Sequence, residues 1–128
     1  DSVSDRLKES DPVAASGHRL LAGRMADKMG EFELATFSHT MAVVYAKASG
    51  RPELMMSTVD TVLKRPANMM NDLLAQNIAE ALLRLIDTGH RDRVRELGSR
   101  LKETRHVDAI RYADTVLERL DQSRPIAR

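Results

Sequence analysis

The sequence predicts an all-α protein whose five to six helices are arranged as antiparallel helical hairpins. Apolar residues recur at the three- and four-residue spacing of amphipathic helices, no segment alternates with the two-residue period of a strand, and Gly and Pro separate the helical segments. The chain has 128 residues, of which 42% are hydrophobic and 30% charged, and this composition suits one globular domain over residues 1–128. Two arrangements stay open, a stack of repeats and a compact helical bundle.

The stretch from residue 17 to residue 52 contains the most clearly specified pair of helices. Asp11 followed by Pro12 predicts a helix start, because an acidic N-cap and a Pro at the first position both favour one. Gly30 predicts the end of this helix, and a second helix follows over 32–49 until Gly50. The predicted inward residues are Val13, Gly17, Leu20, Leu21, Met25 and Met29 on the first helix and Leu34, Phe37, Met41, Val44 and Ala48 on the second.

Four further helical segments follow, over about 52–64, 67–88, 91–104 and 107–121. Pro66 predicts a break between the first two of these, with a kink inside one long helix as the alternative. The segment 67–88 is the most hydrophobic and is predicted to lie at the centre of the core. Residues 1–10 and 122–128 are predicted to be flexible tails.

The first hairpin resembles a tetratricopeptide repeat. The positions that carry the resemblance are Gly23 midway along the first helix, Gly30 at the turn, Phe32 two residues later, and Ala35 and Ala42 on the second helix. Small residues let two antiparallel helices approach closely, and an aromatic side chain can fill the turn. The resemblance implies a stack of hairpins whose concave side, lined by the first helix of each hairpin, binds a peptide.

No catalytic or metal-binding pattern is present in the sequence. There is no Cys, no nucleophile elbow, no phosphate-binding Gly loop and no His-Glu-x-x-His motif. Glu103 and His106 have the spacing of one half of a di-iron site, but that half occurs once and falls at a predicted helix end. His39 is interpreted as a boundary residue. We therefore predict a protein that is not an enzyme, holds no metal or cofactor and has no small-molecule substrate.

Four methionines on either side of Pro66 are the candidate partner-binding residues. They are Met55, Met56, Met69 and Met70. If the two pairs meet at one end of the middle hairpin, their flexible thioether side chains make an adaptable surface, with Met55 or Met69 exposed. The sequence thus favours a protein–protein interaction module or adaptor that binds a peptide or helix of a partner, with self-association through the same residues as a variant.

A row of basic residues near the C-terminus supports an alternative function. The candidate anion-binding residues are Arg91, Arg95, Lys102 and Arg105. Such a row attracts an anionic membrane surface or a nucleic acid, as in a targeting domain cut from a larger protein. Interleaved acids, and a net charge of only +1, favour a solvated, ion-paired face instead. No apolar run reaches the roughly 18 residues of a membrane-spanning helix, and we predict a cytoplasmic protein, with export as the alternative.

Overall fold

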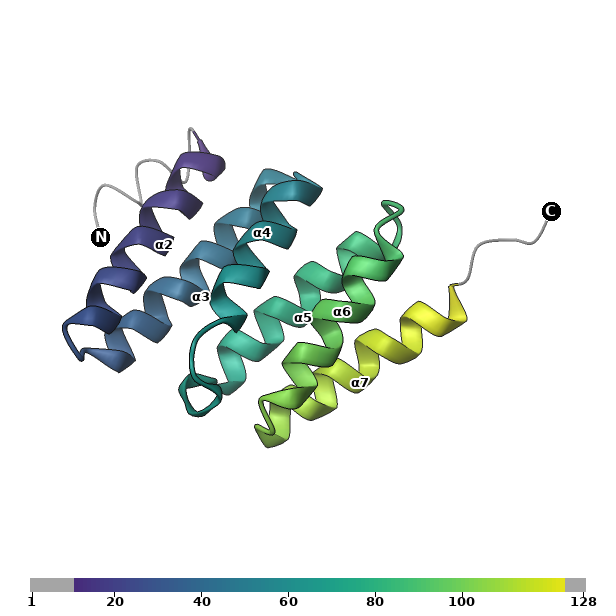
Figure 1. Ribbon diagram of the computed structural model, residues 1–128. Helices are drawn as coiled ribbons and strands as arrows, with labels where there is room; N and C mark the ends of the chain where they lie inside the picture. The colour runs from purple at the N-terminus through teal and green to yellow at the C-terminus, as the bar shows by residue number, and fades with distance from the viewer. Residues whose placement is uncertain (1–10, 124–128) are drawn as a thin grey trace.

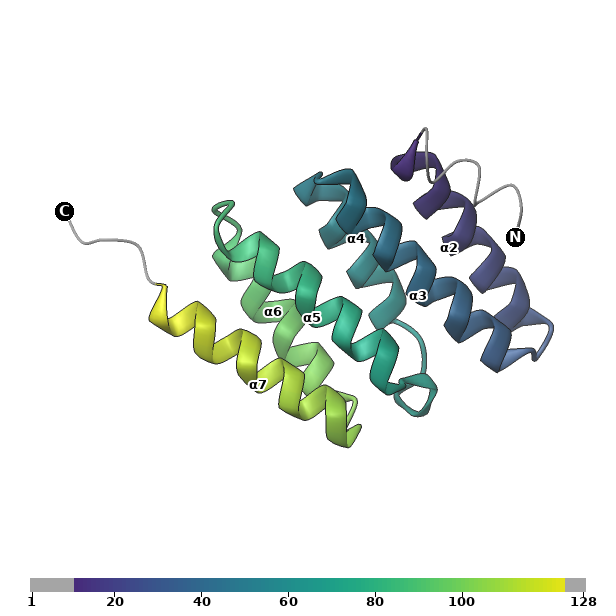
Figure 2. The same cartoon turned by 180° about the vertical axis from the view of Figure 1, so that it is seen from behind.

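The computed structural model describes residues 11–123, which are helical apart from short connections. Its elements in chain order are α2 (Pro12–Lys28), α3 (Phe32–Ser49), α4 (Pro52–Leu63), the short 3-10 helix η1 (Ala67–Met69), α5 (Asp72–Ile86), α6 (Arg91–Glu103) and α7 (Val107–Gln122). Helices α2, α4 and α6 lie side by side in one layer and α3, α5 and α7 in the other (Figure 1, Figure 2). The all-α class and its antiparallel hairpins are confirmed. The predicted tail at 1–10 lies outside the described residues.

The helix boundaries at the start of the chain follow the predicted signals. The Asp11 carboxylate accepts a hydrogen bond from the Ala14 amide at 3.1 Å, which caps α2. Gly30 and Gly50 take left-handed φ angles of 76° and 68° where α2 and α3 end. At the other end of the chain α7 continues to Gln122, so a tail from residue 122 is one residue too early, and 124–128 lie outside the described range.

The segment around Pro66 separates two helices. Helix α4 ends at Leu63, which confirms the predicted break and excludes the kinked long helix. The predicted restart at Ala67 is wrong, because residues 67–69 form only a 3-10 turn and α5 begins at Asp72. The side chain of Asn71 accepts a hydrogen bond from the Leu74 amide at 2.8 Å, so this cap sets the start of α5.

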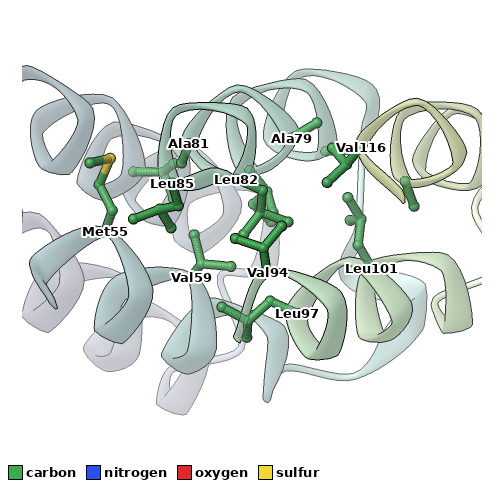
Figure 3. Packing of buried hydrophobic residues seen from close by; sticks show 14 of the residues in the cluster. Met55, Val59, Ala79, Ala81, Leu82, Leu85, Val94, Leu97, Leu101 and Val116 are labelled. Atoms are coloured by element: carbon green, nitrogen blue, oxygen red, sulfur yellow. The ribbon is translucent and has the colours of Figure 1, made fainter. Parts of the chain in front are cut away.

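The main hydrophobic core lies between α4, α5, α6 and α7. Leu82 and Leu85 of α5 pack among Val59 of α4 and Val94 and Leu97 of α6 (Figure 3). All five side chains are fully buried. Helix α5 is the central element, as its hydrophobicity predicts, because it packs against α3, α4, α6 and α7.

The first hairpin packs differently, through small and polar side chains. The buried residues of α2 are Ala15, Ser16, Arg19, Gly23 and Ala26, and those of α3 include Ala35, Thr36, Ser38, His39, Thr40 and Ala42. The hydroxyl of Ser16 donates a hydrogen bond to the Ala42 carbonyl at 2.8 Å. These residues let the two helices approach closely, as the small residues at Gly23, Ala35 and Ala42 predict.

The predicted inward faces of these two helices are therefore wrong for most of the large side chains, although Leu20 does pack against the core. Leu21, Met25 and Met29 of α2 are exposed, as are Leu34 and Phe37 of α3. Periodicity shows that a helix has an apolar face, but it does not show which face the neighbouring helix covers. Here the neighbour covers the small and polar face, and the large apolar side chains point outward.

Candidate functional site

Asp27, Arg65 and His39 form a polar cluster where the first hairpin meets the end of α4. The Arg65 guanidinium forms a bidentate ion pair with Asp27. Its Nε donates to Asp27 Oδ2 and its Nη2 to Asp27 Oδ1, both at 2.9 Å. His39 Nε2 lies 3.1 Å from the same Oδ2. The Arg65 side chain is 7% exposed and that of Asp27 26%. One carboxylate therefore joins α2, α3 and the α4–α5 connection.

Thr36 fixes the other side of the Arg65 guanidinium. Its hydroxyl accepts a hydrogen bond from Arg65 Nη1 at 3.1 Å and donates to the Phe32 carbonyl at 2.9 Å. Because α4 has ended two residues earlier, Arg65 lies in the connection after α4, next to Pro66, and reaches back to the first hairpin. The break at Pro66 thus positions a charged side chain against two distant helices.

Gly23 makes room for the imidazole of His39. A Cβ at this position would lie 2.9 Å from His39 Nε2 and 3.0 Å from two ring carbons. Gly98 of α6 likewise allows close packing against α7, because a Cβ at this position would lie 3.1 Å from Leu117 Cδ2. His39 is 1% exposed, so its interpretation as a boundary residue is wrong. Its Nδ1 has no hydrogen-bond partner within the described part of the chain.

A pocket of about 530 Å³ opens beside this cluster, between α2 and the C-terminal end of α4. It is lined by Arg24, Asp27, Phe32, His39, Thr61, Lys64, Arg65, Pro66 and Met69. The charge of Asp27 is compensated by Arg65 within the cluster. Arg24 forms no ion pair with any residue of 11–123, and Lys64 is 69% exposed beside Asp60. The pocket therefore combines apolar walls with an excess of positive charge.

The pKa values of the two acid–base groups in the cluster are both lowered. Burial lowers the pKa of His39 below 6.5; the Asp27 hydrogen bond opposes this effect, and the Arg65 charge adds to it. Burial alone would raise the pKa of Asp27, but hydrogen bonds from Arg65 and His39 outweigh it and lower the pKa below 3.8. His39 is thus neutral at pH 7, and its Nε2–H donates to the Asp27 carboxylate.

These shifts predict that the free energy of unfolding falls as pH falls below about 6.5. The unfolded chain binds a proton at His39 there, whereas the folded chain does so only at lower pH. Asp27 acts in the same direction below 3.8, because its folded pKa is also depressed. Urea denaturation at pH 7.5, 6.5 and 5.5 measures the slope. The variant His39→Gln should flatten it, and an equal slope in both proteins would contradict the assignment to His39.

The four candidate methionines do not form one surface. Of the two alternatives for an exposed methionine, Met55 is excluded, because it is 3% exposed in the first turn of α4, and Met69 is half-buried. Met56 and Met70 are partly buried against the core. Met69 follows the opposite end of α4 and lines the pocket. The two pairs lie at opposite ends of a helix rather than together, and only Met69 belongs to a candidate site.

The candidate basic residues of α6 are mostly engaged within the protein. Arg91 donates to the carbonyls of Leu120 and Ser123 at 2.6 Å each and so covers the C-terminal end of α7. Arg95 pairs with Asp121 at 2.9 Å and Lys102 with Asp114 at 2.7 Å. Arg105, at φ 62°, has no ion pair within residues 11–123. The row is therefore largely neutralised by α7.

The cluster of Asp27, His39 and Arg65 was not among the candidate residues. Asp27 and Arg65 are 38 positions apart, so no local spacing connects them. The available signal was Gly23 together with a His one position away from the apolar stripe of its helix. No group of three or more potential metal ligands occurs in residues 11–123. Over the same range, no helix has the length and hydrophobicity needed to cross a bilayer.

The site and fold define an all-helical protein of paired helices with a basic and apolar pocket at one junction. The chain matches no protein-family model, no curated protein and no solved structure. The tetratricopeptide resemblance of the first hairpin stays a prediction.

Proposed function

We propose that this chain is a non-enzymatic interaction module that binds an acidic, partly apolar segment of a partner protein in the pocket between α2 and α4. The observation that carries the proposal is the lining of that pocket. Arg24 and Lys64 offer positive charge toward solvent, while Phe32, Pro66 and Met69 offer apolar surface. A segment that alternates carboxylate and aliphatic side chains satisfies both.

The size and rigidity of the pocket support a polypeptide ligand. Its volume of about 530 Å³ lies within the range of small-ligand and peptide side-chain sites. Two hydrogen bonds of 2.9 Å fix the side chains of Arg65 and Asp27 in the wall of the pocket. These side chains therefore lose little conformational entropy when a ligand binds. Phe32 is 46% exposed, which leaves an aromatic face available at the edge of the pocket.

The neighbouring chemistry favours binding over catalysis. The Asp27 carboxylate already accepts three hydrogen bonds, from Arg65 and His39. The neutral His39 donates its single proton to that carboxylate, and its Nδ1 is buried. Neither group is free to exchange a proton with a bound substrate. An anionic membrane or nucleic acid at α6 is a weaker proposal, because Arg91, Arg95 and Lys102 are engaged by α7.

We predict that Arg24→Glu weakens binding of an acidic peptide on the order of tenfold, because it places a like charge at the mouth of the pocket. The probe is a labelled peptide of alternating Glu and Leu, and the comparison peptide replaces every Glu by Lys. Fluorescence anisotropy measures the affinity, and amide chemical shifts locate the site. The expected result is saturable binding of the Glu peptide only, weakened by salt, with shifts near Phe32 and Met69.

Arg119→Glu is the matched control, because it makes the same charge change on the exposed surface of α7. We expect it to change the affinity by less than about twofold. Equal binding of the two peptides, or equal loss in the two variants, would contradict a site at Arg24.

A further inference from the structure

The large apolar side chains that are exposed gather on the first hairpin. Within residues 11–123 eight such side chains are exposed, and only Leu73 and Val107 lie outside α2, α3 and the turn between them. The other six are Leu21, Met25, Met29, Phe32, Leu34 and Phe37. An exposed concentration of this kind marks an interaction surface.

Five of these residues lie on the side of the hairpin that faces away from α4. On α2, Leu20 packs toward the core and Asp27 toward Arg65, so Leu21, Met25 and Met29 occupy the remaining side. On α3, Thr36 and Val43 face Arg65 and the core, so Leu34 and Phe37 occupy the other side. We call Leu21, Met25, Met29, Leu34 and Phe37 the outer apolar face. The pocket between α2 and α4 lies on the opposite side of the hairpin.

The outer apolar face is strongly exposed, with Met29 at 71%, Met25 at 56%, Leu34 at 52% and Phe37 at 51%. The helix at the other end of the protein, α7, is different, because its exposed residues are polar apart from Val107 at its first position. The exposed polar residues are Arg111, Asp114, Thr115, Glu118, Arg119, Asp121 and Gln122. A second copy that stacked head to tail would place an apolar face on a polar one. The pairing that buries apolar area on both copies joins two first hairpins, in a two-fold arrangement.

The outer apolar face has one positive and one negative side chain at its edges, so the edges of two copies can pair opposite charges. Lys28 lies one turn beyond Met25 on α2, and Glu33 lies one turn before Phe37 on α3. Both side chains are exposed, and neither forms an ion pair with a residue of 11–123. If two hairpins pack with their turns at the same end, α2 of one copy lies against α3 of the other. Each Lys28 then meets the Glu33 of the second copy, so these two edge contacts pair opposite charges.

We propose that the outer apolar face is a homodimer interface, in which a second copy packs α3 against α2 about a two-fold axis parallel to the helices. The first hairpins of the two copies together form a four-helix bundle. Each pocket between α2 and α4 stays open, so the dimer presents two equivalent pockets. Dimerisation is independent of the proposed peptide binding.

Sedimentation equilibrium over a wide range of concentration tests the proposal. The wild-type chain should approach a dimer as concentration rises, and Met25→Glu with Phe37→Glu should be a monomer with unchanged helical circular dichroism. Leu73→Glu is the matched control, because Leu73 is 54% exposed on α5, outside the outer apolar face. It should dimerise as the wild type does.

A charge exchange tests the arrangement without touching the apolar residues. Lys28→Glu alone and Glu33→Lys alone each place like charges at both contacts and should weaken the dimer on the order of tenfold. An equimolar mixture of the two variants restores both opposite-charge contacts and should recover the wild-type affinity as a heterodimer. A wild type that stays monomeric, a dimer that survives Met25→Glu with Phe37→Glu, or a mixture no tighter than its components would overturn the proposal.

Discussion

Asp27→Asn should lower the free energy of unfolding by about 2 to 4 kcal/mol, because it removes one member of a largely buried ion pair. The Arg65 side chain is 7% exposed and would keep its charge without the carboxylate that now accepts two of its hydrogen bonds. An uncompensated buried charge costs more than the pair contributes when intact. The amide introduced by Asp27→Asn keeps a single acceptor oxygen, so it cannot accept all three hydrogen bonds that Arg65 and His39 now share on two oxygens.

Urea denaturation followed by circular dichroism measures this change. The control is Asp114→Asn, which removes the partner of Lys102 from a pair whose side chains are 52% and 51% exposed. An exposed pair of this kind contributes about 0 to 1 kcal/mol. If the two variants lost the same free energy of unfolding, the burial of Arg65 would not strengthen the Asp27 pair, and the prediction would be wrong.

Gly23→Ala should lower the free energy of unfolding by about 1 to 3 kcal/mol. The added Cβ would lie 2.9 Å from Nε2 of His39, and that ring cannot move aside without losing its contact with Asp27. Helix propensity alone predicts the opposite sign, since Ala in a helix interior is more favourable than Gly by about 0.5 to 1 kcal/mol. The steric term therefore has to exceed the propensity term.

Gly17→Ala in the same helix separates the two terms. Nothing lies within 4 Å of a Cβ at Gly17, so this variant should gain about 0.5 to 1 kcal/mol. A cycle with His39→Ala completes the test, because the loss at Gly23 should largely disappear once the ring is removed. Stabilisation by both Gly→Ala variants would refute the close packing of Gly23 on His39.

The sequence predicts most of the helix boundaries, because local chemistry decides those points. The Asp11–Pro12 start, the left-handed glycines at 30 and 50 and the break at Pro66 each act within one turn of chain. The start of α5 was missed, because the side chain of Asn71, rather than the apolar pattern from Ala67, supplies the cap.

The direction of the helix faces and the polar cluster depend on distant parts of the chain. The apolar side chains of α2 and α3 have the spacing of a core stripe, yet the small and polar face is the buried one. Asp27 and Arg65 meet only because the connection after α4 turns back toward α2. No pattern within one helix contains that information, and the candidate site was therefore not predictable residue by residue.

The small and polar contact between α2 and α3 has a consequence for how the protein opens. Only Val43 and Ala46 of this hairpin are fully buried in the main hydrophobic core, and Leu20 packs against it. Charged contacts add the pairs of Arg65 with Asp27 and of Lys47 with Glu80. We expect the first hairpin to open at a lower free energy than α4 to α7, because it shares few buried apolar side chains with them. Slow amide exchange should persist longest in α5, and sub-global opening would expose the buried imidazole of His39 before the rest of the chain unfolds.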